Sequence, residues 1–173
     1  MAAAQWSDTP PLEGRCVWLE PLRVEHAREL APLLDDLSLH VFIGGAPAGL
    51  RELEERYRGQ VAGYSPDGRE RWLNWVVRRA TGEAVGTVQA TVKLDGERAV
   101  AEVAWVVASA HQGRGYARDA ARTMVSLLRQ QGVERIVAHI HPEHGASAGV
   151  ARAVGLQPTP VVVDGETRWE SRP

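Results

Sequence analysis

A glycine-containing turn between a predicted strand and a predicted helix is the segment best suited to chemistry. Residues 103–107 are apolar and rich in valine, which is typical of a strand, and residues 117–128 carry apolar side chains at helical spacing. Between them lies Gln112-Gly113-Arg114-Gly115. A helix start offers unpaired backbone N–H groups and a partial positive charge, and glycine lets a ligand approach the backbone closely. The turn therefore suits a phosphate or pyrophosphate, with a tight connection that binds nothing as the alternative.

The residues of this turn exclude two common phosphate-binding patterns. A P-loop requires Lys-Ser/Thr after its last glycine, but Gly115 is followed by Tyr116-Ala117. A dinucleotide fingerprint requires a third glycine, where this chain has Arg118. The pattern Gln112-x-x-Gly115-x-Ala117 instead resembles the Gln/Arg-x-x-Gly-x-Gly/Ala motif of the GNAT superfamily of N-acetyltransferases. In that family the loop binds the pyrophosphate of acetyl-CoA.

A second segment extends the resemblance. His144-x-x-Ser147, followed by a short helix and Gly155-Leu156, is similar to the family segment Asn-x-x-Ser, short helix, Gly-Phe. Within the family the chain looks most like the RimJ/RimL-like branch, which shares an opening like Leu19-Glu20-Pro21-Leu22. The resemblance implies that the cofactor is held by the backbone at the end of the preceding strand, by the turn and by this second segment. The implied contacts are Trp105, Val106, Val107, Gln112, Gly113, Arg114, Gly115, Tyr116, Ala117, Arg118, His144 and Ser147.

Two side chains are candidates for the proton transfers that accompany acetyl transfer. Glu102 lies between Ala101 and Val103, so we predict an apolar setting in which it takes the proton of the attacking amine. A solvent-facing glutamate is the alternative. Ser147 matches the serine of the family segment, and no tyrosine follows it where many relatives place a tyrosine acid, so the resemblance implies that Ser147 donates a hydrogen bond to the leaving thiolate. Capping of the short helix is the alternative for Ser147.

The acceptor side is less clearly specified by the sequence. Trp72, Asn74, Trp75, Gln89 and Thr91 lie on neighbouring predicted strands and are candidates for lining an acceptor pocket. Asp35 and Asp36 are candidates for attracting a cationic amine. We predict no metal site, because His139, His141 and His144 have no nearby cysteine and no added carboxylate pattern that would fix a tetrahedral set.

Composition limits the remaining classes of function. The chain of 173 residues suits one domain, and its net charge of −2 argues against a nucleic-acid-binding surface. The single cysteine, Cys16, cannot form an internal disulfide, and no apolar run approaches the 18 residues of a membrane span. We therefore expect a cytoplasmic protein without nucleic-acid or membrane partners. A homodimer is compatible with the resemblance, since dimers are common in this branch.

The predicted elements form one domain. They are a strand at 16–19, a helix at 24–37 interrupted by Pro32, a helix at 50–61, strands at 72–78, 84–92 and 99–107, a helix at 116–131, a strand at 133–140, a helix at 144–154 and a hairpin of 161–163 with 167–170. Tight turns imply antiparallel pairs, and the strand-helix-strand step implies one parallel pair. The expected fold class is α/β (α+β): a GNAT-like mixed, mostly antiparallel sheet of about six to seven strands, covered by helices on both faces. Residues 1–11 are expected to form a flexible tail and residues 12–173 the domain.

The sequence therefore predicts an N-acetyltransferase that moves an acetyl group from acetyl-CoA directly to a primary amine. A protein or peptide N-terminus is one candidate acceptor. A small amine, such as an aminoglycoside, a polyamine or an amino acid, is the alternative, and a CoA-binding module without turnover is a third option. The sequence does not decide between these acceptors.

Overall fold

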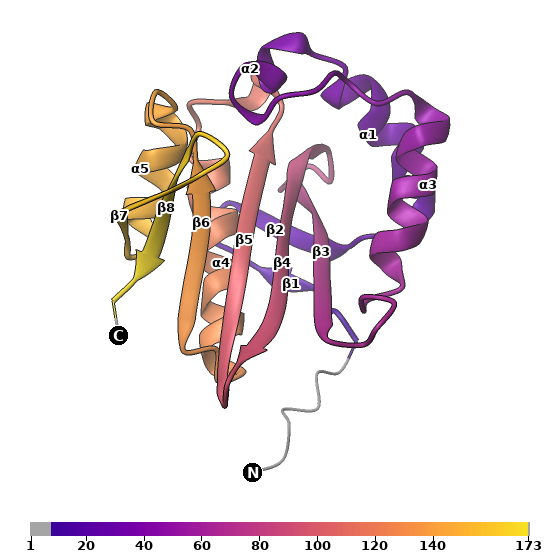
Figure 1. Ribbon diagram of the computed structural model, residues 1–173. Coiled ribbons are helices and arrows are strands. Elements are labelled where there is room, and N and C mark those ends of the chain that lie inside the picture. Colours follow the sequence, from indigo (N-terminus) through magenta and orange to yellow (C-terminus); the bar gives the residue numbers. More distant parts are fainter. Residues whose placement is uncertain (1–7, 173) are drawn as a thin grey trace.

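The computed structural model describes residues 8–172, apart from the side chain of residue 43. Its centre is an eight-stranded sheet in the order β1-β2-β3-β4-β5-β6-β8-β7 (Figure 1). The strands are β1 (Leu12–Glu13), β2 (Val17–Pro21), β3 (Glu70–Arg79), β4 (Ala84–Asp95), β5 (Arg98–Val107), β6 (Arg135–Ile140), β7 (Leu156–Val163) and β8 (Glu166–Ser171). Neighbouring strands are antiparallel except for the parallel pair β5–β6. The predicted mixed sheet is confirmed, with more strands than expected because the two-residue β1 is too short to leave a sequence pattern.

The helices agree with the sequence except near Pro32 and at 40–43, where a short helix was not predicted. They are α1 (Ala27–Leu34), α2 (His40–Ile43), α3 (Leu50–Val61), α4 (Tyr116–Gln130) and α5 (Gly145–Ala153), with single 3₁₀ turns η1 (Val24–His26), η2 (Leu37–Leu39) and η3 (Ser109–His111). The helix predicted at 24–37 is shorter, since its first residues form the turn η1 and α1 ends at Leu34. The expected interruption at Pro32 is not found, because α1 continues through this residue. The helix predicted at 116–131 matches α4 to within one residue.

Helices cover both faces of the sheet, as predicted, and each face has its own core. On one face α4 and α5 pack against the strands, and Met124 of α4, Ala151 of α5 and Ile136 of β6 belong to one buried cluster. On the other face α1 and α3 place Leu30 and Leu53 against Val76 of β3. In Figure 1 the near side of β5, β6 and β8 carries no helix. This side is called the open face below.

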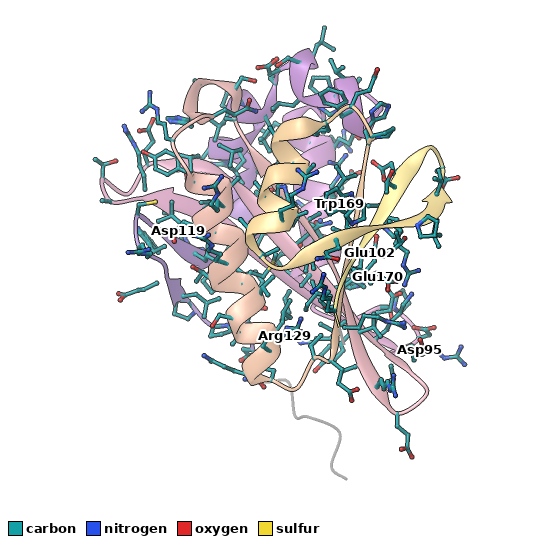
Figure 2. The ribbon with its side chains drawn as sticks, turned by 90° about the vertical axis from the view of Figure 1, so that its left-hand side faces the viewer. Asp95, Glu102, Asp119, Arg129, Trp169 and Glu170 are labelled. Atoms are coloured by element: carbon teal, nitrogen blue, oxygen red, sulfur yellow. The ribbon has the colours of Figure 1, made fainter. Side chains whose placement is uncertain are left out.

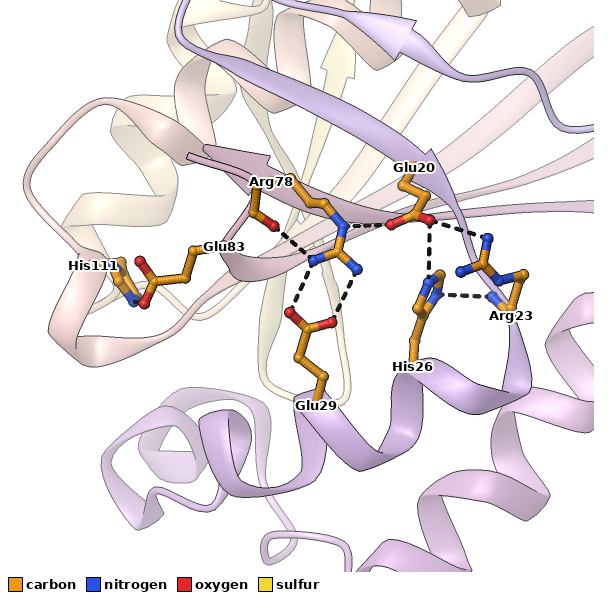
Figure 3. A network of polar contacts seen from close by, with 8 residues as sticks. Glu20, Arg23, His26, Glu29, Arg78, Glu83 and His111 are labelled. Carbon is orange, nitrogen blue, oxygen red and sulfur yellow. Dashed lines mark hydrogen bonds and ion pairs between the residues drawn. The ribbon is translucent and has the colours of Figure 1, made fainter. Parts of the chain in front are cut away.

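A polar network fixes α1 to the sheet (Figure 3). The guanidinium of Arg78 on β3 donates to Glu20 on β2 and, at 2.8 and 2.9 Å, to both carboxylate oxygens of Glu29 on α1. Burial is the largest single influence on the pKa of Glu20 and acts to raise it, but the hydrogen bond from Arg78 and the positive charges of Arg78, His26 and Arg23 together hold this pKa below its ordinary value. Burial also lowers the pKa of His26, whose Nε2 lies 3.4 Å from Glu20 Oε1. The network therefore sets the position of α1, which helps to wall a cavity described below.

The parallel strands β5 and β6 are paired over a short distance only. Their three paired positions are Val100–Arg135, Ala101–Ile136 and Glu102–Val137. Beyond them β5 continues to Val107 beside β4, and β6 continues beside β8. Among the described residues no further β5–β6 pairing is found, so the two strands part after Glu102.

The last hairpin is longer than predicted. β7 begins at Leu156 rather than at Val161, and it passes through Pro158 and Pro160. These prolines are tolerated because β7 is the edge strand, where a missing N–H need not remove a ladder bond.

The predicted tail is described only in part, since residues 1–7 lie outside the described range. Within the rest, the carbonyl oxygen of Pro10 accepts a 2.7 Å hydrogen bond from Trp75 Nε1. Within residues 8–172, no helix is both long and apolar enough to cross a membrane.

Candidate functional site

The turn between β5 and α4 has the backbone shape that its glycines predict. Gly113 and Gly115 have φ angles of 76° and 81°, and Gly115 is the N-cap of α4. These left-handed conformations strain residues with a side chain, so glycine is required at both positions. Gln112 Nε2 donates a 2.9 Å hydrogen bond to the carbonyl of Val107. The glutamine therefore closes the turn onto the end of β5.

The same turn leaves room for an anion. A Cβ built on Gly113 or Gly115 would meet no heavy atom within 4 Å, so open space lies above both residues. The first N–H groups of α4 have no acceptors within the helix, and they carry the positive end of the helix dipole. Arg118, in the first turn, adds an exposed guanidinium. These features fit a pyrophosphate group.

A groove with a volume of about 630 Å³ runs past this turn and is called the loop groove. Every residue predicted to contact the cofactor lines it except Arg114, whose exposed side chain lies outside. The sequence did not predict six further lining residues, three of which come from the η2–α2 segment. These are Ser38, Leu39, Phe42, His111, Ala146 and Val150.

His144 begins α5 at the position where the family motif has asparagine. Its Nδ1 accepts a 3.4 Å hydrogen bond from the backbone N–H of Ser147, so the imidazole caps the helix. The ring is stacked on Phe42 with 4.4 Å between centroids. Burial, with a smaller contribution from His141, lowers the pKa of His144. A neutral ring whose Nδ1 accepts carries its proton on Nε2, so His144 offers an N–H donor.

Ser147 is tied to β5 rather than to the helix cap. Its Oγ accepts a 3.0 Å hydrogen bond from Trp105 Nε1, while the cap is supplied by His144. The capping alternative for Ser147 is therefore wrong. Because the indole occupies an acceptor site, the hydroxyl proton of Ser147 is still able to donate to a ligand in the loop groove.

A second cavity, called the inner cavity, lies between the α1–α3 side of the molecule and β3, β4 and β5. It has a volume of about 190 Å³ and shares Leu39, Trp105 and Val106 with the loop groove. The two cavities therefore meet at the end of β5. Of the side chains predicted on the acceptor side, three line the inner cavity, namely Asn74, Trp75 and Gln89.

The other predicted acceptor residues lie elsewhere. Trp72 and Thr91 line neither cavity. Asp35 and Asp36 line a separate hollow beside Ser109, and Asp36 Oδ1 accepts a 2.8 Å bond from the backbone N–H of Ser38. Their position outside the inner cavity means that they do not line the route to the end of β5.

Glu102 does not have the apolar setting predicted for it. Its side chain is 53% exposed on the open face, lines neither cavity, and lies 3.0 Å from His139 Nδ1. The reason is the alternation of a strand, because Ala101 and Val103 point to the buried side and Glu102 to the other. Figure 2 labels Glu102 together with Glu170, which lies on β8 beyond β6.

The three histidines considered for a metal make separate contacts. His139 faces Glu102, His141 Nδ1 accepts from the backbone N–H of Glu143, and His144 caps α5. Within the described part of the chain, no group of three or more His, Cys, Asp or Glu side chains is arranged to hold a metal ion.

Asp119 is a structural residue of the site that the sequence did not reveal. It lies in the first turn of α4 and is 8% exposed (Figure 2). Its carboxylate accepts the backbone N–H groups of Arg15, Cys16 and Val17 at 3.1, 2.8 and 3.1 Å. Burial acts to raise the pKa of Asp119, but these three bonds outweigh it and hold the pKa below its ordinary value. Asp119 thus joins the start of α4 to the start of β2.

Comparison with known proteins places this arrangement in a family. Residues 17–157 match the family model described as an acetyltransferase (GNAT) domain. The chain belongs to the GNAT acetyltransferase family. No curated protein matches its sequence.

Solved GNAT structures share the fold at low sequence identity. RimL, a ribosomal alpha-N-protein acetyltransferase in complex with coenzyme A, has a TM-score of 0.77 at 13% identity, over 93% of this chain and 97% of that one. RimJ of Mycobacterium smegmatis in complex with a CoA disulfide has a TM-score of 0.75 at 22% identity, over 98% of this chain and 89% of that one. AAC(6')-Ib in complex with an aminoglycoside and acetyl-CoA has a TM-score of 0.74 at 20% identity, over 91% of this chain and 93% of that one. These likenesses show that this GNAT chain has the fold of RimJ and RimL.

Proposed function

We propose that this GNAT protein transfers an acetyl group from acetyl-CoA to a primary amine. The observation that carries the proposal is the meeting of the loop groove and the inner cavity at Trp105 and Val106. A donor and an acceptor that enter from these two sides would reach the same strand end. Acetyl-CoA supplies an acetyl group on a thioester, and RimL and AAC(6')-Ib were solved with coenzyme A or acetyl-CoA.

The turn and the end of β5 have the groups to hold this donor. The N–H groups at the start of α4, with Arg118, bind the pyrophosphate, and Gly113 and Gly115 leave space for it. Past Glu102 the backbone of β5 has no partner in β6, so N–H groups near Val106 are available to the pantetheine arm and to the thioester oxygen. His144 and Ser147 line the same groove and add an N–H and an O–H donor.

The reaction requires a base for the amine proton and a hydrogen-bond donor for the leaving sulfur. As the amine nitrogen bonds to the acyl carbon, the carbon–sulfur bond breaks, the nitrogen loses a proton and the sulfur keeps the electron pair. An alkyl ammonium has a pKa of about 10.4, so a base is needed. Glu102 takes this proton through water, since it lies outside both cavities, and His139 orients its carboxylate from 3.0 Å. The hydroxyl of Ser147 donates a hydrogen bond to the sulfur.

Thiol release from acetyl-CoA over a panel of amines and N-terminal peptides tests the proposal. Release that depends on an amine supports it. A protein that is stabilised by acetyl-CoA but releases no thiol with any acceptor is a CoA-binding module, and the proposal then fails. A protein N-terminus is the first acceptor to examine, because RimL is an alpha-N-protein acetyltransferase of similar structure.

The role of Glu102 has a matched control. Glu102→Gln should lower turnover by about 10²- to 10⁴-fold, the usual contribution of a general base, and leave acetyl-CoA affinity unchanged. Glu170→Gln removes a carboxylate from the same face that is paired with Arg168, and it should have little effect. Equal activity of the wild type and the Glu102 variant would remove Glu102 from the mechanism.

A further inference from the structure

The lining of the inner cavity has an unusual charge pattern for a site that accepts an amine. Among the described residues that line it, none is aspartate or glutamate, and Arg56 on α3 is the one side chain with a permanent charge. Burial raises the pKa of Tyr57 in the same lining to about 12, so its hydroxyl is neutral at physiological pH. A second positive charge on the acceptor would find no carboxylate here to pair with.

The cavity also limits the size of its occupant. Its volume of about 190 Å³ is below the roughly 300–1,000 Å³ that is usual for drug-sized ligands. Arg56 and Val106 line this same small space, so a group held by the guanidinium and an amine at the end of β5 belong to one short molecule or one residue.

Arg56 is available for such a group. Its side chain is 51% exposed, and its NH2 group lies 3.3 Å from Glu52 Oε1, one turn earlier on α3. Exposed pairs of this kind contribute little and exchange partners readily. A guanidinium presents a planar pair of N–H donors that matches a carboxylate. Arg56 therefore suits a carboxylate on the acceptor.

Three neutral amides contribute to the polar lining, which also includes His40 and Thr87. Gln60 on α3 donates from Nε2 to Gln89 Oε1 on β4 over 3.5 Å, and Gln89 is paired in register with Asn74 on β3. The contact uses one N–H of Gln60 and one lone pair of Gln89, so further donors and acceptors remain. They suit amide and carboxylate groups of an acceptor.

We infer that the acceptor is a primary amine that bears a carboxylate a few bonds away, and that Arg56 determines this specificity. The inference rests on the proposed acetyl transfer. Two sources carry this chemistry: a free amino acid, and a peptide whose N-terminal residue has an acidic side chain. Polyamines and aminoglycosides are disfavoured, because each places additional positive charge beside Arg56.

The experiment compares the unsubstituted chain with two arginine variants. Arg56→Gln removes the cavity guanidinium. Arg58→Gln is the matched control, because Arg58 forms the same kind of one-turn pair on α3, with Glu54, but does not line the cavity. The acceptors are L-glutamate, a peptide beginning with aspartate, the same peptide beginning with alanine, spermidine and kanamycin. Thiol release gives kcat/KM for each, and calorimetry without the donor gives acceptor binding.

The expected result is highest kcat/KM for L-glutamate or the aspartyl peptide, and the better of the two identifies the source. Arg56→Gln should lower that value and the binding constant by about 10- to 100-fold, as expected for a hydrogen-bonded charge, and Arg58→Gln should change neither. Higher kcat/KM for spermidine or kanamycin, or an Arg56→Gln variant with unchanged preference, overturns the inference while leaving acetyl transfer in place. If no acceptor releases thiol, the proposed function fails, and the binding measurement alone then supports or overturns the role of Arg56.

Discussion

Asp119→Asn gives the sharpest test of how the start of α4 is held. The substitution keeps the size of the side chain but removes its charge, and its amide turns an N–H group toward backbone N–H groups. Of the three bonded N–H groups, that of Val17 is buried, whereas Arg15 and Cys16 are exposed and can turn to water. A hydrogen bond to a charged group contributes about 1.5–3 kcal/mol. Asp119→Asn should therefore lower the free energy of unfolding by about 3 kcal/mol, which is the contribution of between one and two such bonds.

Urea denaturation measures this loss as a change in the free energy of unfolding at constant m-value. For a domain of this size, about 3 kcal/mol corresponds to a fall of about 6–12 °C in Tm. The control is Asp95→Asn, since the carboxylate of Asp95 is 67% exposed and pairs with Arg135 at the surface, where the cost is about 0–1 kcal/mol. A loss below 1 kcal/mol for Asp119→Asn would refute the reasoning.

The pH dependence of the same variant provides a second check. The pKa of Asp119 is lower in the folded state than its ordinary value, so its contribution to stability is present above that value and disappears as the pH falls through the lowered pKa. Wild type and Asp119→Asn should therefore converge in stability in strong acid. Gly14→Ala should act on the same contact, because a Cβ there would lie 2.6 Å from Asp119 Oδ2.

Three further predictions concern the site and its support. Gly115→Val should weaken acetyl-CoA binding, measured by isothermal titration. The control Gly132→Val introduces the same backbone strain after the other end of α4 and should leave this binding unchanged. Equal acetyl-CoA affinities of the two variants would place the anion site elsewhere. Ser147→Ala should lower turnover by about 10- to 150-fold and the free energy of unfolding by about 1 kcal/mol. In a Trp105→Phe background, which already lacks the bond from the indole to Ser147, the same substitution should still lower turnover but should no longer lower stability. Because burial lowers the pKa of His26, the Tm of the wild type should fall as the pH drops below about 6.5, and His26→Gln should fall less; parallel curves would contradict this.

The strand, turn and helix of the loop groove could be predicted because their signals are local. The valines at the end of β5, the apolar spacing of α4 and the paired glycines are all read within about 30 residues. The left-handed angles of Gly113 and Gly115 agree with that prediction. The apolar setting predicted for Glu102 was wrong, because adjacent residues of a strand face opposite sides and the apolar neighbours Ala101 and Val103 do not describe the surroundings of the Glu102 side chain.

Contacts between distant segments could not be predicted. Asp119 is one of 22 acidic residues, and its partners lie 102 to 104 positions earlier in the chain. Phe42 reaches the loop groove from a segment with little sequence pattern, and its stacking on His144 depends on how that segment crosses the end of the sheet. Arg56 looks like any arginine on an amphipathic helix with a glutamate four residues earlier. Only the packing of α3 distinguishes it from Arg58.

The parting of β5 and β6 after Glu102 has a consequence for hydrogen exchange. From Val103 to Val107, β5 is paired with β4, while the edge toward β6 has no strand partner among the described residues. Alternate amides along this stretch should therefore exchange with deuterium faster than their neighbours, although the strand lies in the middle of the sheet. A donor that binds along this edge would slow the exchange of the amides that face β6. It would leave the exchange of the amides that face β4 unchanged. Exchange measured residue by residue would thus follow occupancy and register of the pantetheine arm in the absence of any turnover.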